Sequence, residues 1–172
     1  DSALGQPAPG IPAFRRNRQF MFGVPAGPPV RNALERTAFV YTSAPVDHDT
    51  DVIGHPIVHL WAGSSAPDGD FFFYLEDVAP DGTATLVTDH QHRAGFHQVQ
   101  DPDGIIPGHT GIRVLPRLPW HGYRAADYDG RIFSDGAAHE IVLALNPTAW
   151  RFRAGHSIRL AVDRKSTRLN SS

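Results

Sequence analysis

The sequence predicts an all-β protein folded as a β-sandwich, and three observations lead to this prediction. Short runs rich in β-branched and aromatic residues recur from Thr37 onward, and turn-forming residues separate them. No apolar pattern with a helical period extends beyond about ten residues. Because each strand buries one face, two packed sheets are the natural way to form a core, for which 172 residues are sufficient.

The runs that carry the strand signal are spread over most of the chain. In order, they read TAFVYTS, IVHLWAG, DFFFYLEDV, ATLVTD, GIRVLP, HEIVLAL and HSIRLAV. The turns between them include Ala-Pro-Asp-Gly at 66–69 and Pro-Asp-Gly at 80–82, in which proline fixes φ and glycine tolerates a positive φ. Consecutive aromatic residues such as Phe72 and Phe73 must point to opposite faces of their strand.

Alternating apolar residues near the end of the chain place two strands against one core. These residues are Ile141, Leu143 and Leu145 in one strand and Ile158, Leu160 and Val162 in the other. We expect any helix to be a short turn, such as one over 147–152.

The two ends of the chain differ in composition from the middle. Residues 1–30 carry proline or glycine every few positions and are predicted to form an extended lead-in loop before a sandwich at 31–162. Residues 163–172 form a polar tail with the chain's only lysine, Lys165. Two interpretations of this tail stay open, a disordered polar end and a non-native sequence.

Composition excludes several classes of partner and site. The net charge of −2 predicts no nucleic-acid partner, and no apolar run is long enough to span a membrane. We therefore expect a soluble protein without a membrane partner. The absence of cysteine excludes disulfides and thiolate metal sites, and it leaves the compartment unknown, with a slight preference for the cytoplasm.

Three blocks, at 31–89, 118–130 and 143–162, together resemble the C-terminal domain of X-Pro dipeptidyl-peptidases and of cocaine-esterase (CocE/NonD) serine hydrolases. They begin RNALERTAFVYTS, LPWHGYRAADYDG and LALNPTAWRFRAG. The resemblance implies a jelly-roll sandwich related to galactose-binding-like modules. Because family members continue past the strand that ends at Val162, it also implies that the sandwich is truncated at its C-terminal end.

The resemblance further implies an accessory role beside an α/β-hydrolase catalytic domain of the same parent chain. The parent would cleave esters or amides through an acyl-serine, and the sandwich would stabilise it. Phe20, Met21 and Phe22 fall where relatives place an apolar loop, so by resemblance they would bind a small acyl substrate at the domain interface. The alternative is that these three residues anchor the loop on the sandwich.

The chain itself shows no catalytic triad, and we predict no catalytic residue within it. An α/β-hydrolase serine needs a strained strand-to-helix turn, usually Gly-x-Ser-x-Gly, and no such sequence is present. Ser65 and Ser157 have glycine two positions before them but lack glycine two positions after. No cofactor is predicted.

Histidines at 90, 92 and 97 raise the question of a metal site. His90 and His92 would share one face of a strand, as a pair of ligands requires, but no carboxylate follows to complete the site. Surface or loop histidines are therefore the preferred interpretation, and no metal is predicted. In the segment AGHSIRL, Gly155 would permit a turn, and Arg159 would point to solvent or pair with a carboxylate.

A different class of function remains open as an alternative. A jelly-roll can act as an autonomous carbohydrate-binding module, which stacks sugars on exposed aromatic side chains. The candidates for such a platform are Trp61, Trp120 and Trp150.

Overall fold

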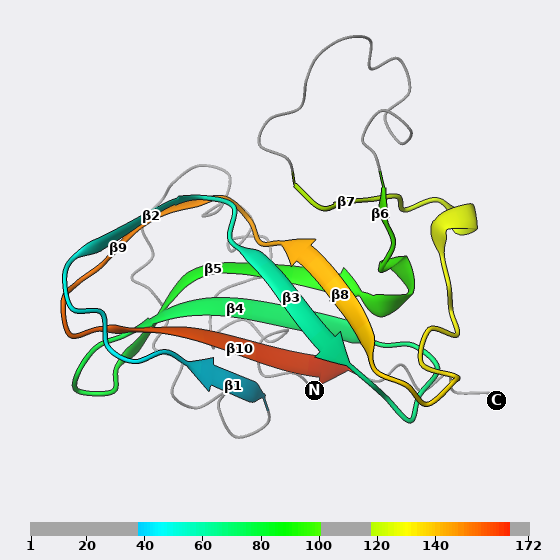
Figure 1. Ribbon diagram of the computed structural model, residues 1–172, viewed down its shortest axis with the longest axis horizontal. Coiled ribbons are helices and arrows are strands. Elements are labelled where there is room, and N and C mark those ends of the chain that lie inside the picture. The colour runs from blue at the N-terminus through cyan, green and yellow to red at the C-terminus, as the bar shows by residue number, and fades with distance from the viewer. Residues whose placement is uncertain (1–37, 101–117, 166–172) are drawn as a thin grey trace, which may run out of the picture.

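The computed structural model describes residues 38–100 and 118–165, and within them it confirms the all-β prediction (Figure 1). Its strands are β1 (Phe39–Thr42), β2 (Thr50–Gly54), β3 (Ile57–Ala62), β4 (Asp70–Val78), β5 (Ala84–Arg93), β6 (Val99–Gln100), β7 (Trp120–His121), β8 (His139–Ala144), β9 (Thr148–Phe152) and β10 (Ser157–Lys165). The helices of the described residues are short 3₁₀ turns, η1 (Ala94–Phe96) and η2 (Ala125–Asp127).

Four antiparallel strands form the larger sheet, in the order β1-β10-β4-β5. Strand β10 pairs with β4 along its whole length, from Ser157 opposite Val78 to Lys165 opposite Asp70. A bulge between Leu75 and Glu76 shifts the register of β5 against β4. The sheet therefore joins the AGHSIRL segment directly to the aromatic strand β4.

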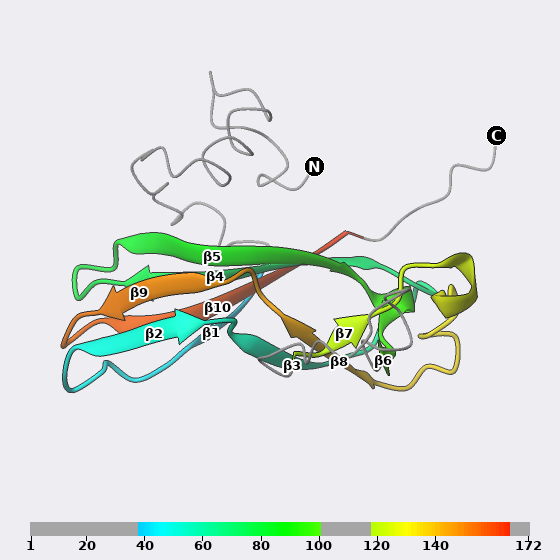
Figure 2. The same ribbon diagram turned by 90° about the horizontal axis from the view of Figure 1, so that it is seen from above.

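The opposite layer is an antiparallel ribbon in which β2 pairs with β9 and β3 pairs with β8. The pairing breaks where Pro56 and Pro147 occur, because proline has no N–H to donate. At the break, Leu145 donates its N–H to the carbonyl of Pro56 at 2.8 Å, and His55 Nδ1 donates to the carbonyl of Leu145 at 3.0 Å. Figure 2 shows the ribbon and the sheet as two layers.

The core lies between these two layers. It is built from Val58, Phe71, Phe73, Leu75, Ala94, Ile132, Phe133, Ile141, Leu143, Leu145 and Val162, with Ile158 and Leu160 packed against it. The predicted alternation of apolar residues in the two closing strands is thus confirmed. Each layer contributes one face, as expected for a sandwich.

The outward faces of the two layers differ sharply in exposure. On the outer face of the larger sheet, Tyr74 is 5% exposed and Glu76 only 2%. On the ribbon, by contrast, the outward side chains of Ile53 and Trp61 are 81% and 68% exposed. Outward side chains at the middle of the larger sheet are therefore buried, whereas the ribbon presents apolar side chains to solvent.

Several sequence expectations are changed or left untested by the structure. The helical turn expected over 147–152 is wrong, because residues 148–152 form β9 in register with β2. Strand β10 continues past the expected boundary at 162, to Lys165. The lead-in loop at 1–30 lies outside the described residues, and the jelly-roll order of strands stays a prediction. In the described ranges, no helix has the length and apolar character needed to cross a membrane.

Candidate functional site

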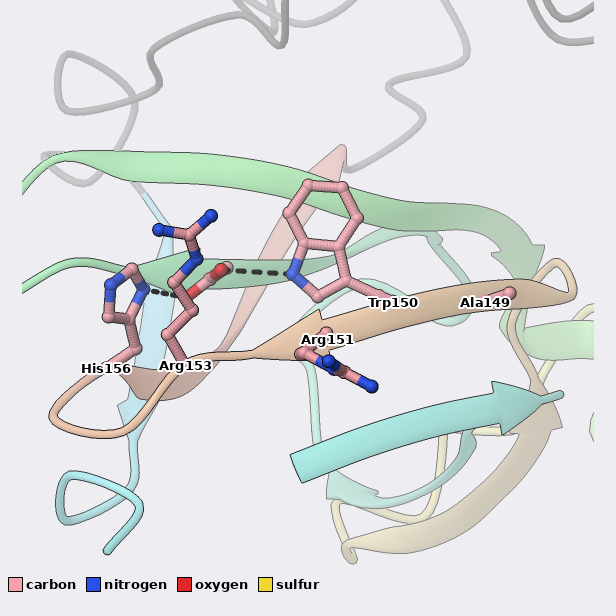
Figure 3. Close-up of a pocket in the computed structure, with 6 residues that line it drawn as sticks. Ala149, Trp150, Arg151, Arg153 and His156 are labelled. Carbon is pink, nitrogen blue, oxygen red and sulfur yellow. Dashed lines mark hydrogen bonds and ion pairs between the residues drawn. The ribbon is translucent and has the colours of Figure 1, made fainter. Parts of the chain in front are cut away.

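A hollow of about 300 Å³ opens at the end of the sandwich where β9 turns back into β10 (Figure 3). Its described lining consists of Asp77, Ala149, Trp150, Arg151, Arg153 and His156. Gly155 makes the turn possible because its φ is +83°, in the left-handed region that favours glycine. The expected role of this glycine in the AGHSIRL segment is confirmed.

Asp77 is the centre of this site. Its side chain is buried on the inward face of β4, where an isolated carboxylate would be strongly disfavoured. His156 Nδ1 donates to Asp77 Oδ1 at 2.8 Å, and Trp150 Nε1 donates to Asp77 Oδ2 at 3.0 Å. Both carboxylate oxygens are therefore satisfied, and β4, β9 and β10 are tied together at this end.

The chemistry available to this site is limited by what lines it. An Asp–His pair supplies two members of a catalytic triad, but acyl transfer also needs a nucleophile within reach of the histidine. No serine, threonine or cysteine is among the described residues that line the hollow. The observed contacts of Asp77 join β4, β9 and the turn before β10.

Arg159, also in the AGHSIRL segment, lies on the covered outer face of the larger sheet. Its Nη1 atom is 3.9 Å from Glu76 Oε2, and both side chains are largely buried. This matches one of the two expected arrangements, in which Arg159 pairs with a carboxylate.

A second buried carboxylate, Asp68, joins segments far apart in the sequence. It accepts hydrogen bonds from Arg93 Nε and Tyr128 Oη at 2.6 Å each, and from the N–H groups of Gly69 and Gly95 at 2.7 and 2.9 Å. Burial opposes the charge of Asp68, but the bonds from these four donors outweigh it and hold the pKa of Asp68 below its usual value. From the sequence alone, Asp68 is expected only in a turn.

The histidine group contains the largest departure from the sequence expectation. His90 and His92 share the inward face of β5, opposite Phe73 and Phe71, as predicted. His92 is only 2% exposed, so its interpretation as a surface histidine is wrong. Neither of its ring nitrogens makes a hydrogen bond of normal geometry with the described residues.

Burial disfavours the charged form of His92. Together with the nearby rings of His121, His90 and His97, it lowers the pKa of His92 to about 3. The His121 ring packs with its centre 4.6 Å from that of His92. In the part of the chain that the structure describes, no three ligating side chains are placed to hold a metal ion.

The remaining candidate residues are not brought together. Phe20, Met21 and Phe22, the predicted substrate-binding residues, lie outside the described residues. Trp61 is exposed on the ribbon, whereas the indole N–H of Trp150 donates to Asp77. The described residues contain no α-helix, so they offer no strand-to-helix turn for a nucleophile at Ser65 or Ser157.

Comparison with protein families shows which family the chain resembles. The model of the X-Pro dipeptidyl-peptidase C-terminal non-catalytic domain matches residues 23–169. The chain belongs to this family. Membership confirms the resemblance drawn from the sequence.

Curated relatives are much longer than this chain. Proteins of Mycobacterium bovis and Mycobacterium tuberculosis, both provisionally named serine esterases, are 37% identical to it over 134 residues. The match covers 78% of this chain and 20% of each relative. The chain thus spans about one fifth of their length.

Solved structures with similar folds are also larger hydrolases. A CocE/NonD family hydrolase from Staphylococcus aureus has a TM-score of 0.59 at 16% identity, and the match covers 75% of this chain and 23% of that one. An α-amino acid ester hydrolase has a TM-score of 0.51 at 16% identity, covering 88% of this chain and 20% of that one. At these identities the similarity shows the fold.

Proposed function

We propose that this non-catalytic domain belongs to a longer serine hydrolase and stabilises an α/β-hydrolase catalytic domain in the same polypeptide. The observation that carries the proposal is the family match over 23–169, in a chain one fifth as long as its relatives. The chemistry resides in the remaining part of the longer protein. The domain contributes docking area and rigidity.

The reaction class follows from the family and its relatives. X-Pro dipeptidyl-peptidases act on peptide bonds, and the mycobacterial relatives are named as esterases. Both reactions are acyl transfers, which a serine nucleophile can perform through an acyl-enzyme intermediate. The parent protein therefore cleaves esters or amides.

A second part of the proposal concerns the substrate. Phe20, Met21 and Phe22 wall the acyl pocket of the catalytic domain, on the side where the two domains meet. The support for this role is the resemblance to cocaine-esterase-type proteins and the compact apolar cluster itself. Replacing Phe22 with Ser should raise the KM for a butyryl ester more than the KM for an acetyl ester.

The direct test compares two purified proteins, this chain alone and the longer protein that contains it. Both are assayed with p-nitrophenyl butyrate and with an X-Pro p-nitroanilide. The longer protein should hydrolyse at least one of them, and a serine-directed phosphonate should stop the reaction. Turnover by this chain alone that the phosphonate also blocks would overturn the proposal.

A further inference from the structure

Three large apolar side chains are exposed on the outward side of the ribbon. We call the outward side chains of β2, β3, β8 and β9 the ribbon face. Ile53, Ile57 and Trp61 are its large apolar members, and all three are exposed. In a strand with one solvated face, outward positions normally carry polar residues, so three exposed apolar side chains on one face favour contact with another molecule.

Polar side chains of the same face pair with each other. Arg151 Nε and Nη2 donate to the two carboxylate oxygens of Asp51 at 2.6 and 2.9 Å, in a two-bond pair. His59 Nδ1 lies 3.0 Å from Glu140 Oε1. A partner that covers the ribbon face would therefore bury Arg151 beside an opposite charge, which avoids the larger cost of burying an unpaired charge.

The outer face of the larger sheet is a weaker candidate for the same role. Tyr74 and Glu76 are already buried there within this chain. Of the two outward faces, only the ribbon face combines large apolar side chains with wide exposure in the described residues. A partner that gains free energy by burying apolar surface gains most on the ribbon.

We infer that the ribbon face docks against the catalytic domain of the same longer protein, with Trp61 as its main anchor. This inference rests on the proposed function. Relatives carry about four fifths of their length outside the matched region, so a partner is tethered to the domain. Tethering gives an effective concentration near millimolar, well above that of a second copy in dilute solution.

The chemistry around Trp61 also separates this partner from a sugar. A carbohydrate platform needs polar groups free to bind hydroxyls beside the aromatic ring. Glu140, which lies opposite Trp61, instead contacts the side chain of His59. An apolar protein surface is the better match, and tryptophan is enriched at the centres of protein interfaces.

The test uses hydroxyl-radical labelling of the full-length protein. The labelling rate of Trp61 is divided by that of Tyr123, an exposed aromatic residue between β7 and η2 that serves as the internal reference. The same ratio measured in urea supplies the intrinsic reactivities. In the native protein, docking should lower the ratio by roughly tenfold, because the centre of an interface excludes water.

A pair of variants tests the same surface independently. Ile53→Arg places an unpaired charge in the ribbon face, whereas Val99→Arg makes the matched change at an exposed position of β6. In the full-length protein, Ile53→Arg should separate the thermal unfolding of the two domains into distinct transitions. Val99→Arg should leave the wild-type profile intact.

The outcomes distinguish this inference from the proposed function. A full-length protein that hydrolyses esters while Trp61 labels as fast as in urea, relative to Tyr123, would overturn the inference and leave the proposed function standing. A protein with protected Trp61 and no acyl-transfer activity would overturn the proposed function. Protection that disappears on hundredfold dilution would assign the ribbon face to a second copy and also overturn the inference.

Discussion

The two ends of the sandwich handle buried polar groups in opposite ways. The β9–β10 turn and the β6–β7 pair lie at opposite ends of the molecule (Figure 1). At the first end, Asp77 is buried, and both of its oxygens accept hydrogen bonds from His156 and Trp150. At the second, His92 is buried as deeply, but its ring nitrogens make no normal hydrogen bond with the described residues.

The contacts of Asp77 stabilise the fold, whereas the burial of His92 makes stability depend on pH. A buried carboxylate with complete partners holds three strands together. Burial of the His92 imidazole favours its neutral form, so the stability of the end that contains it depends on pH. The described residues that line the Asp77 hollow include no serine, threonine or cysteine.

The largest predicted effect is at the Asp77 end. Asp77→Ala removes the acceptor for two buried donors and should lower the free energy of unfolding by about 3 kcal/mol. Asp81→Ala, in the exposed turn four residues later, is the control and should cost no more than about 1 kcal/mol. Urea unfolding followed by far-ultraviolet circular dichroism measures both changes.

That prediction also separates stability from catalysis. In the full-length protein, Asp77→Ala should lower the unfolding temperature, while kcat measured well below that temperature stays within about twofold of wild type. If kcat instead fell by three orders of magnitude with the fold intact, the Asp77–His156 pair would be part of a catalytic centre.

The next effect is an acid sensitivity at the His92 end. The pKa of His92 is about 3 in the folded chain and about 6.5 in an unfolded one, so the unfolded state binds more protons between these values. The contribution of neutral His92 to the free energy of unfolding is therefore fully present above pH 6.5 and is lost as the pH drops toward 3. The loss attributable to His92 should be about 2 kcal/mol between pH 7 and pH 5.

A substitution isolates this contribution. His92→Phe removes the titrating group while keeping a ring against His121, and it should flatten the dependence of stability on pH between 7 and 5. His48→Asn changes an exposed histidine instead and serves as the matched control. An unchanged pH dependence in His92→Phe would show that His92 is not the source of the acid sensitivity.

The smallest effect is expected between the two ends, on the ribbon. Trp61→Ala removes an exposed side chain and should change the unfolding free energy of this chain by less than about 0.5 kcal/mol. Denaturant unfolding of wild type and variant measures the difference. A loss above 2 kcal/mol would mean that Trp61 supports the fold of the domain itself, and docking would then be a poor explanation for its exposure.

The sequence predicted those parts of the fold that depend on local pattern. Alternation at 141–145 and 158–162 placed both strands against the core, and Gly155 marked the turn before β10. Strand β9 was missed because Pro147 and the residues after it are also compatible with a helical turn. The side chain of Asn146 donates to the carbonyl of Asp89 in β5, and this long-range bond helps to fix the extended path.

The sites were harder to predict because their partners are distant in sequence. The donors to Asp68 include Arg93, Gly95 and Tyr128, which lie 25, 27 and 60 residues further along the chain. His92 was interpreted as a surface or loop residue because no carboxylate follows His90 and His92 to complete a metal site. Only the pairing of β5 with β4, which sets His92 opposite Phe71, determines that its ring is buried.

The most direct test of the central claim is to locate the reactive serine of the full-length protein. The protein is labelled with a fluorophosphonate, digested, and the modified peptide identified by mass spectrometry. We predict that the labelled serine lies outside the 172 residues of this chain. A phosphonate adduct on Ser65, Ser157 or any other serine of this chain would contradict the account.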